Sequence, residues 1–432
     1  MEVDFNDFWT EKDDSIKIDF SFDPLGVMVI WRLFAQEIFG NKITTVANNM
    51  RYYLINLFNL TTIRILLRND KIKEKYLCQH YDETKFRDDL IIFLENLFIY
   101  CSSEKNVNPV PGVAKYKALK DKKKYIICFE GKPEKYEILT RQLQLGISGR
   151  YKTPFKEMGL DYNDIIKDNI VNGNWEKASL LIEEKYNSLI EKIVTFLEEK
   201  EFSSCIQGKE ISDICSELIK VKLLNASTIP DNLSNFLLKK IGLTDDTAKI
   251  LYDIVKEYKD NEDKDVNVKD IFEEAEAKTN DEKIKNIIAL ESFLAPIQHA
   301  FDGIIETNNE DLSDYKKLEE KLPNPNIEID IGILDKSETA KKRFFKLKEI
   351  VRSNDKIKKL IEYHNKVQEE RGSPAWVFVD ENNKINRVKL VGTRTKLEDW
   401  LKKSEKEKRF DRWKNDYYIS SLKSIMDSMG SK

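Results

Sequence analysis

Residues 46–60 read VANNMRYYLINLFNL, and this stretch decides the fold class. Its large apolar side chains recur at alternating intervals of four and three residues, at Val46, Met50, Tyr53, Leu57 and Leu60. That period places all of them on one face of an α-helix. We therefore predict an amphipathic helix here, with Thr44 or Thr45 as its N-terminal cap.

Similar apolar stripes elsewhere predict a mainly α, multi-domain helical protein. Helices are expected at 25–39, where Gly40 ends the first of them, at 83–101 and over 182–196. Only ten prolines and fifteen glycines occur in 432 residues, so long helices can form with few breaks.

Two short segments have the composition of strands instead. The run KKKYIICFEG (122–131) predicts one strand within a small α+β element near 115–150. The alternating runs on either side of a polar turn predict a β-hairpin near 375–392. We expect both to be small additions to a helical architecture.

A glycine-rich turn follows the predicted strand. Residues 138–145 can form two helical turns, and Gly146, Gly149 and Pro154 are then expected to prevent the helix from continuing. This turn is the most unusual stretch of the chain, because its glycines allow backbone amides to approach an anion.

Length and charge distribution predict five segments. A chain of 432 residues exceeds what one hydrophobic core usually organises. Acidic residues outnumber basic ones in 257–282, as in an exposed connector, and we place the main domain boundary there. The expected segments are a helical domain at 1–104, a basic segment with a strand and glycine-rich turn at 105–160, a helical domain at 161–258, an acidic connector at 259–285 and a helical domain with the hairpin at 286–432.

The N-terminal helices allow two interpretations. A short turn at Gly40 and Asn41 precedes polar side chains that can read a DNA groove, namely Thr44, Thr45, Asn48, Asn49 and Arg51. This order is typical of a helix-turn-helix domain. In a plain helical bundle the same asparagines would lie on the solvent face, and we favour the bundle.

The cysteines bear on the cellular compartment. There are five, Cys78, Cys101, Cys128, Cys205 and Cys215, and most lie in apolar runs. The odd number and wide spacing favour buried free thiols and a reducing compartment. No stretch reaches the roughly 18 apolar residues of a membrane span, and the acidic first residues differ from a secretory signal. We expect a cytoplasmic protein without membrane contact.

The sequence carries no recognisable catalytic motif. Its three histidines, His80, His299 and His364, are far apart, and it has no glycine-rich phosphate loop or nucleophile elbow. We assign no catalytic residue, no metal ligand and no cofactor, and we expect a protein that is not an enzyme. A metal-dependent nuclease whose acidic residues are not marked by any motif remains an alternative.

A basic segment supplies the candidate binding residues. Thirteen Lys and Arg residues stand against four Asp and Glu between Lys105 and Lys156, although the whole chain has a net charge of −4. Cations that alternate with aromatic residues are typical of nucleic-acid binding, because the cations neutralise phosphates. The candidate contacts are Lys122, Lys123, Lys124, Arg141, Arg150, Tyr151 and Lys152. The alternative is a solvated basic face.

A second basic region lies at 384–414, with twelve Lys and Arg against five Asp and Glu. Its helical spacing indicates that the tryptophans pack and the charges face water. We therefore give this region less weight as a nucleic-acid surface.

Two stretches carry a family resemblance: SFDPLGVMVIWRLFAQEIFGNKITTVANNMRYYLINLF (21–58) and LTRQLQLGISGRYKTPFKEMGL (139–160). They resemble segments of poorly characterised helical proteins that bacteria encode beside helicases and nucleases in phage-defence gene clusters. The resemblance implies a non-catalytic, nucleic-acid-binding or recognition subunit of an antiphage defence assembly. Its expected partners are an ATPase, helicase or nuclease subunit and double-stranded DNA. A protein–protein adaptor without nucleic-acid contact is the main alternative.

Overall fold

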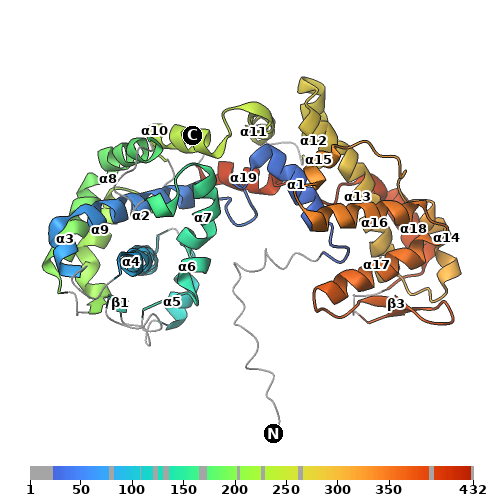
Figure 1. Ribbon diagram of the computed structural model, residues 1–432, viewed down its shortest axis with the longest axis horizontal. Coiled ribbons are helices and arrows are strands. Elements are labelled where there is room, and N and C mark those ends of the chain that lie inside the picture. Colours follow the sequence, from blue (N-terminus) through green and yellow to red (C-terminus); the bar gives the residue numbers. More distant parts are fainter. Residues whose placement is uncertain are drawn as a thin grey trace, which may run out of the picture. The chain divides into compact units, whose positions relative to one another are not determined.

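The protein is mainly helical, with two small two-stranded antiparallel sheets (Figure 1). The computed structural model describes residues 23–76, 82–107, 109–119, 125–129, 136–164, 173–201, 205–224, 229–260, 266–388 and 394–429. None of the helices in these ranges is long and apolar enough to cross a membrane. The mainly helical composition with two small sheets confirms the predicted fold class.

The chain forms two compact units, and each is built from separated parts of the sequence. The described residues of unit 1 fall within 41–245 and 421–429, and those of unit 2 within 23–40 and 246–420. This division differs from the boundary expected in the acidic segment. The reason is that the first helix and the last residues each pack with a unit far away in sequence.

Unit 1 is a helical domain with one small sheet. Its elements are α2 (Met50–Arg68), α3 (Asp70–Tyr76), α4 (Glu83–Glu104), α5 (Val113–Leu119), β1 (Tyr125–Cys128), α6 (Gln142–Leu145), α7 (Ile147–Glu157), η4 (Tyr162–Asp164), α8 (Gly173–Glu199), β2 (Cys205–Gln207), η5 (Gly208–Ile211), α9 (Ser212–Lys220) and α10 (Asp231–Ile241). The helices predicted near 83–101 and 182–196 are confirmed as α4 and α8.

Helix α2 packs against α4, α7 and α8, and α4 is seen end-on in the middle of the unit (Figure 1). Asn49 caps α2, because its side chain accepts hydrogen bonds from the backbone N–H groups of Arg51 and Tyr52. The helix therefore begins at Met50, later than the threonine caps predicted. Fifteen of its nineteen residues are buried, among them Asn56 and Asn59.

This burial corrects the helix-turn-helix interpretation. A recognition helix must expose one face to a DNA groove, and α2 is enclosed on most sides. Thr44, Thr45 and Asn48 lie in the loop before it rather than on it. The preceding helix, α1 (Met28–Phe39), belongs to unit 2, so the two helices do not form one motif.

The small sheet of unit 1 corrects the expectation for the cysteines. Strand β1 was predicted, but its partner β2 was not, and their antiparallel register places Cys128 opposite Cys205. These two residues form one disulfide, and Cys101 of α4 forms a second with Cys215 of α9. Four of the five cysteines are therefore paired rather than free, and Cys78 lies outside the described residues.

Unit 2 is a second helical domain that contains a β-hairpin. Its elements are α1, α11 (Asp246–Asp260), α12 (Val268–Thr279), α13 (Glu282–Glu306), η6 (Leu312–Tyr315), α14 (Lys316–Glu319), α15 (Ile331–Leu334), α16 (Glu338–Arg352), α17 (Lys356–Glu370), β3 (Val377–Val379), β4 (Ile385–Arg387), α18 (Leu397–Lys406) and η7 (Arg409–Asp411). Helix α19 (Ile419–Ser428) begins in this unit, and its residues from Ser421 onward belong to unit 1.

The described part of the acidic segment contains a packed helix, α12, which an exposed connector would not have. Within it, α12 contacts α11 and α13. Phe272 of α12 is fully buried, and its ring stacks on Trp413 at a centroid separation of 5.3 Å. Ile271 and Ala275 are buried on the same side. The acidic residues of α12 lie on its exposed side, so net charge alone misled the prediction.

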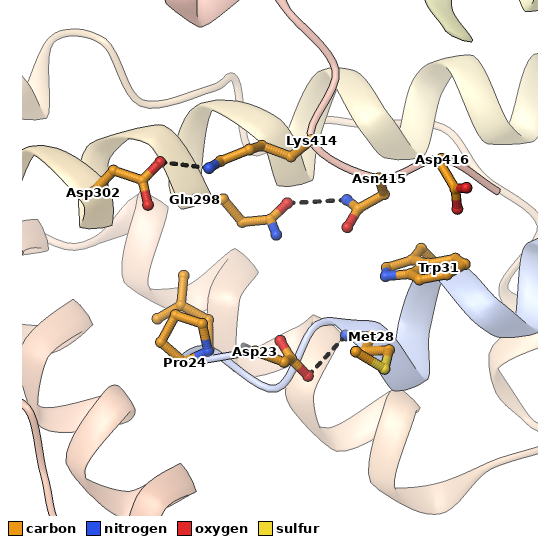
Figure 2. Close-up of a pocket in the computed structure, with 10 residues that line it drawn as sticks. Asp23, Pro24, Met28, Trp31, Gln298, Asp302, Lys414, Asn415 and Asp416 are labelled. Atoms are coloured by element: carbon orange, nitrogen blue, oxygen red, sulfur yellow. Dashed lines mark hydrogen bonds and ion pairs between the residues drawn. The ribbon is translucent and has the colours of Figure 1, made fainter. Parts of the chain in front are cut away.

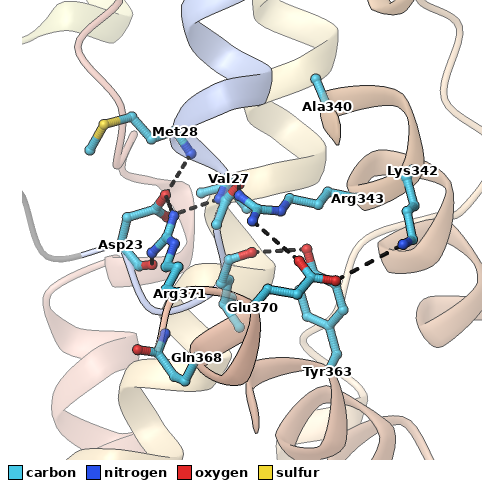
Figure 3. A network of polar contacts seen from close by, with 12 residues as sticks. Asp23, Val27, Met28, Ala340, Lys342, Arg343, Tyr363, Gln368, Glu370 and Arg371 are labelled. Carbon is cyan, nitrogen blue, oxygen red and sulfur yellow. Dashed lines mark hydrogen bonds and ion pairs between the residues drawn. The ribbon is translucent and has the colours of Figure 1, made fainter. Parts of the chain in front are cut away.

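A polar network fastens the start of α1 to α16 and α17 (Figure 3). The Asp23 carboxylate accepts hydrogen bonds from the N–H groups of Val27 and Met28 at the start of the helix, and it pairs with Arg371 at 3.0 Å. Beside it, Arg343 pairs with Glu370 at 3.5 Å. These contacts explain why α1 belongs to unit 2.

The predicted β-hairpin is confirmed as β3 and β4. Phe378 is 41% exposed and Val388 is 57% exposed, although both are large and apolar. Val388 lies opposite Trp376, because its N–H donates to the Trp376 carbonyl, and side chains alternate along a strand. Phe378 and Val388 are therefore on the same face of the hairpin.

Candidate nucleic-acid interface

Helices α6 and α7 form the glycine-rich turn, and they correct its prediction. The chain does not stop at Gly149 or Pro154, because both lie inside α7. A Cβ on Gly149 would overlap the Gln144 carbonyl, so glycine lets the first turn of α7 pack closely on α6. Pro154 removes one backbone donor from the helix without ending it.

A buried carboxylate holds this turn from below. Glu95 of α4 accepts a hydrogen bond from the Ser148 N–H at 2.7 Å, and it also accepts one from the Gln142 side chain at 3.3 Å. Gly146 makes room for it, because a Cβ there would overlap the carboxylate. The carboxyl group lies at the N-terminal end of α7, where negative charge is stabilised.

Two buried carboxyl groups of α4, Glu95 and Asp89, respond to pH. Burial raises the pKa of Glu95 to about 7, although hydrogen bonds from Ser148 and Gln142 act in the opposite direction. Burial also raises the pKa of Asp89 to about 7, and the Tyr136 hydroxyl donates a hydrogen bond to it at 2.8 Å. Both carboxyls therefore bind a proton more tightly in the folded state than in an unfolded chain.

We expect the free energy of unfolding of unit 1 to fall as pH rises. A carboxyl group with a raised pKa adds to the free energy of unfolding. This stabilisation is complete below the pKa of the group in the unfolded chain, about 4.3, and is lost as pH rises through the folded pKa of about 7. Glu95 alone should account for on the order of 3 kcal/mol. Urea unfolding at pH 5 and pH 8 measures this loss. Glu95→Gln should reduce the loss by about half, and adding Asp89→Asn should remove most of the remainder. An unchanged loss in the double variant would contradict the assignment.

Tyr151 does not lie on the surface. Its side chain is 0% exposed, and its hydroxyl donates to the Asn49 carbonyl at 3.2 Å and accepts from the Asn49 N–H at 3.1 Å. Its ring meets that of Tyr53 edge to face, with centroids 4.6 Å apart. Tyr151 joins α7 to the start of α2, so we omit it from the candidate contacts.

Cations line the outer side of the same helices. Arg141 and Lys152 are exposed, as a binding role requires, and neither forms an ion pair with a described residue. Arg150 is half-buried, and its positive charge acts to lower the pKa of Glu95. The predicted contacts Lys122, Lys123 and Lys124 lie outside the described residues.

Two further cations belong to this surface and were not singled out from the sequence. Lys156 is exposed and follows Lys152 by four residues, which places both on one side of α7. Lys115 of α5 donates to the Thr140 hydroxyl at 2.9 Å, next to Arg141. The four-residue spacing of Lys152 and Lys156 predicts that both lie on one side of a helix, provided that the helix is taken to continue past Pro154. We call Arg141, Lys152 and Lys156 the α6–α7 cations.

The second basic region differs, because several of its cations point inward. The Arg387 guanidinium donates to the carbonyls of Ile304 and Asn309, at 2.7 and 2.8 Å. Arg409 pairs with Glu306 at 2.9 Å. These groups hold the hairpin and η7 in place and are not available to a phosphate chain.

Two further sources of functional evidence are groups of metal-ligating side chains and similarity to known proteins. Within the described ranges, no three His, Cys, Asp or Glu side chains are grouped so that they could hold a metal ion. Comparison of the chain with protein-family models, with curated proteins and with solved structures gives no match.

Proposed function

We propose that this chain is a non-catalytic, nucleic-acid-binding subunit of a prokaryotic antiphage defence assembly. In this proposal it contacts the phosphate backbone of double-stranded DNA through the α6–α7 cations, while an ATPase, helicase or nuclease subunit supplies the chemistry. The defence assignment rests on the sequence resemblance, and the binding assignment rests on charge and geometry.

One observation carries the binding proposal. Arg141, Lys152 and Lys156 are exposed and form no ion pair within the described ranges, whereas the side of α7 that carries Tyr151 is fixed to α2 and α4. Cations on a fixed helix bind phosphates with less loss of side-chain and backbone entropy than cations on a loose chain. Phosphate contacts of this type position a protein on DNA without reading its sequence.

The salt dependence of DNA binding tests the proposal. We expect the affinity of the full chain for a fluorescent duplex to fall steeply between about 50 and 300 mM salt, because each phosphate contact releases counterions. The triple variant Arg141→Ala, Lys152→Ala, Lys156→Ala should reduce the logarithmic salt slope by up to about 3, at about 0.9 per contact. Fluorescence anisotropy measures both quantities.

The matched control removes three exposed lysines of unit 2, Lys402, Lys406 and Lys408, which also form no ion pair with a described residue. This variant should keep the wild-type slope. If it loses the slope and the α6–α7 variant keeps it, the proposed surface is wrong. Absence of binding at about 50 mM salt would reject a nucleic-acid role.

The exposed face of the hairpin favours the adaptor as a second candidate. Phe378 and Val388 are exposed apolar side chains on one face of β3 and β4 in unit 2. An adaptor that associates through such side chains should bind its protein partner as tightly at 500 mM salt as at 50 mM salt, because apolar contacts are not screened. Phe378→Ser would then weaken the association.

The compartment is part of the proposal. A nucleic-acid-binding subunit of this type works in the cytoplasm, which is also the compartment expected from the sequence. The two disulfides weigh against that location, because cytoplasmic reductants keep most thiols unpaired.

A further inference from the structure

Unit 2 contains a cavity of about 260 Å³ between the start of α1, helix α13 and the segment before α19 (Figure 2). One wall is mainly apolar, with Pro24, Leu25, Met28 and the ring of Trp31, and it also carries the Asp23 carboxylate. The other carries amide and charged groups: Gln298, Asp302, Lys414, Asn415 and Asp416. A concave site with an apolar wall and a few placed polar groups is the usual form of a small-molecule pocket.

Two hydrogen-bond donors in this cavity have no acceptor among the described residues. The indole nitrogen of Trp31 and the amide nitrogen of Gln298 both point into the cavity in Figure 2. Neither donates a hydrogen bond to any residue in the described part of the chain. Trp31 as a whole is only 7% exposed, which leaves its indole nitrogen open mainly toward the cavity. A polar group in this position is costly unless a ligand or water accepts its hydrogen bond.

A buried carboxylate fixes the direction in which these amides point. Glu291 is fully buried, and its Oε2 accepts a hydrogen bond from the Asn415 amide nitrogen at 2.8 Å. That same nitrogen donates to the Gln298 oxygen at 2.9 Å. The Gln298 oxygen is thereby turned toward Asn415, and its nitrogen is left to face the cavity. The Asn415 oxygen faces the cavity too (Figure 2).

The charges around the cavity limit the ligand. Asp23, Asp302 and Asp416 line it, against one lysine, Lys414. Burial acts to raise the pKa of Asp302, but His299 and Lys414 hold it below its usual value, so this carboxyl is ionised. Asp302 pairs with Lys414, and Asp23 pairs with Arg371. Among the lining carboxylates, Asp416 is left without an ion pair to a described residue, and its charge would repel an anionic ligand.

We propose that the cavity binds a small, uncharged aromatic carboxamide. The carbonyl oxygen of the ligand accepts hydrogen bonds from Trp31 and Gln298, and the amide N–H of the ligand donates to the Asn415 oxygen. The ring lies against the apolar wall. The site lies in unit 2 and uses none of the α6–α7 cations, so it is independent of the proposed DNA surface.

A pair of matched probes tests the proposal on the full chain. Benzamide and benzoate have nearly the same shape, but benzoate replaces the amide N–H with negative charge. We expect isothermal titration calorimetry to show at least about tenfold tighter binding of benzamide. Equal affinity for the two probes would overturn the proposal, as would no benzamide binding up to about 10 mM.

Two variants locate the binding site. Trp31→Phe keeps the apolar ring and removes the indole donor, and Gln298→Met keeps the length of the side chain and removes the amide. Each should weaken benzamide binding by about fivefold to tenfold, the value of one neutral hydrogen bond. The control Gln144→Met changes an exposed glutamine of α6 and should bind as wild type does. Circular dichroism melting confirms that each variant is folded, and if Trp31→Phe fails to fold, Gln298→Met decides alone. Wild-type affinity in a folded Gln298→Met variant would place the ligand elsewhere and reject the site.

Discussion

Reduction of the two disulfides should lower the free energy of unfolding of unit 1 by several kcal/mol. The bonds join residues 114 and 77 positions apart, Cys101 to Cys215 and Cys128 to Cys205. Cross-links that close loops of this length restrict the unfolded chain by about 4 to 5 kcal/mol each in the chain-entropy estimate. Native-state strain and residual structure in the unfolded chain usually make the measured loss smaller.

Urea unfolding with and without dithiothreitol measures this effect. The paired variants Cys101→Ser with Cys215→Ser, and Cys128→Ser with Cys205→Ser, should each reproduce part of the loss, and adding dithiothreitol to the quadruple variant should change nothing further. Alkylation of the protein freshly purified from its own cell, followed by mass spectrometry, shows which thiols were paired there. Five alkylated cysteines would mean that the bonds do not form in the cell and would support a reducing compartment.

Replacing Glu291 by leucine should be the most damaging single substitution in unit 2. Its carboxylate accepts hydrogen bonds from the N–H groups of Lys414 and Asn415, at 2.6 and 3.0 Å, and from the Asn415 amide and the Tyr417 hydroxyl, both at 2.8 Å. Leucine would leave the two backbone N–H groups and the Tyr417 hydroxyl without this acceptor, at about 1 to 3 kcal/mol for each group that cannot reach water. The Asn415 amide would keep the Gln298 oxygen as its acceptor. We expect a total loss of about 4 kcal/mol or more.

The backbone beside this carboxylate adds to the expected loss. Tyr417 and Tyr418 have φ values of 47° and 63°, in the left-handed region that large side chains rarely adopt. Such residues persist only where the surrounding contacts hold them, at a cost of about 1 to 3 kcal/mol each. The hydrogen bond from the Tyr417 hydroxyl to Glu291 is one of the contacts that keep Tyr417 in this conformation.

Two control substitutions make the measurement specific. Glu291→Gln keeps one oxygen acceptor and should cost less than Glu291→Leu in urea unfolding followed by tryptophan fluorescence. Glu282→Leu changes a side chain that is 79% exposed on the same helix and should have little effect. If both leucine variants unfold at the same urea concentration, Glu291 has no special structural role.

The sequence predicts those elements whose signal is local. Helices α2, α4 and α8 follow from their apolar period, because one face of each is buried whatever its neighbours are. The start of α2 was misplaced because Thr44, Thr45 and Asn49 are all acceptable caps, and only the fold selects Asn49. Strand β2 was missed because three residues carry no period, and their pairing with β1 is a long-range contact.

The candidate site shows how one missed helix changes the assignment of a residue. With the chain broken at Gly149, Tyr151 was placed beside the cations as a surface contact. With α7 continuous, Ile147, Tyr151 and Phe155 recur every four residues on the buried side, and Lys152 and Lys156 recur on the exposed side. The cations of this region can be recognised from composition. The burial of Glu95 cannot, because it results from the packing of α4 against α6 and α7 and has no local pattern in the sequence.

The discontinuity of the two units constrains the order in which they can be completed. Residues 421–429 belong to unit 1, and they follow all of unit 2 in the chain. During translation from the N-terminus, unit 1 therefore waits for the ribosome to finish unit 2 before its last segment can dock. For the same reason, cutting the gene after residue 245 would separate each unit from one of its own parts, so neither half is a suitable fragment to express alone.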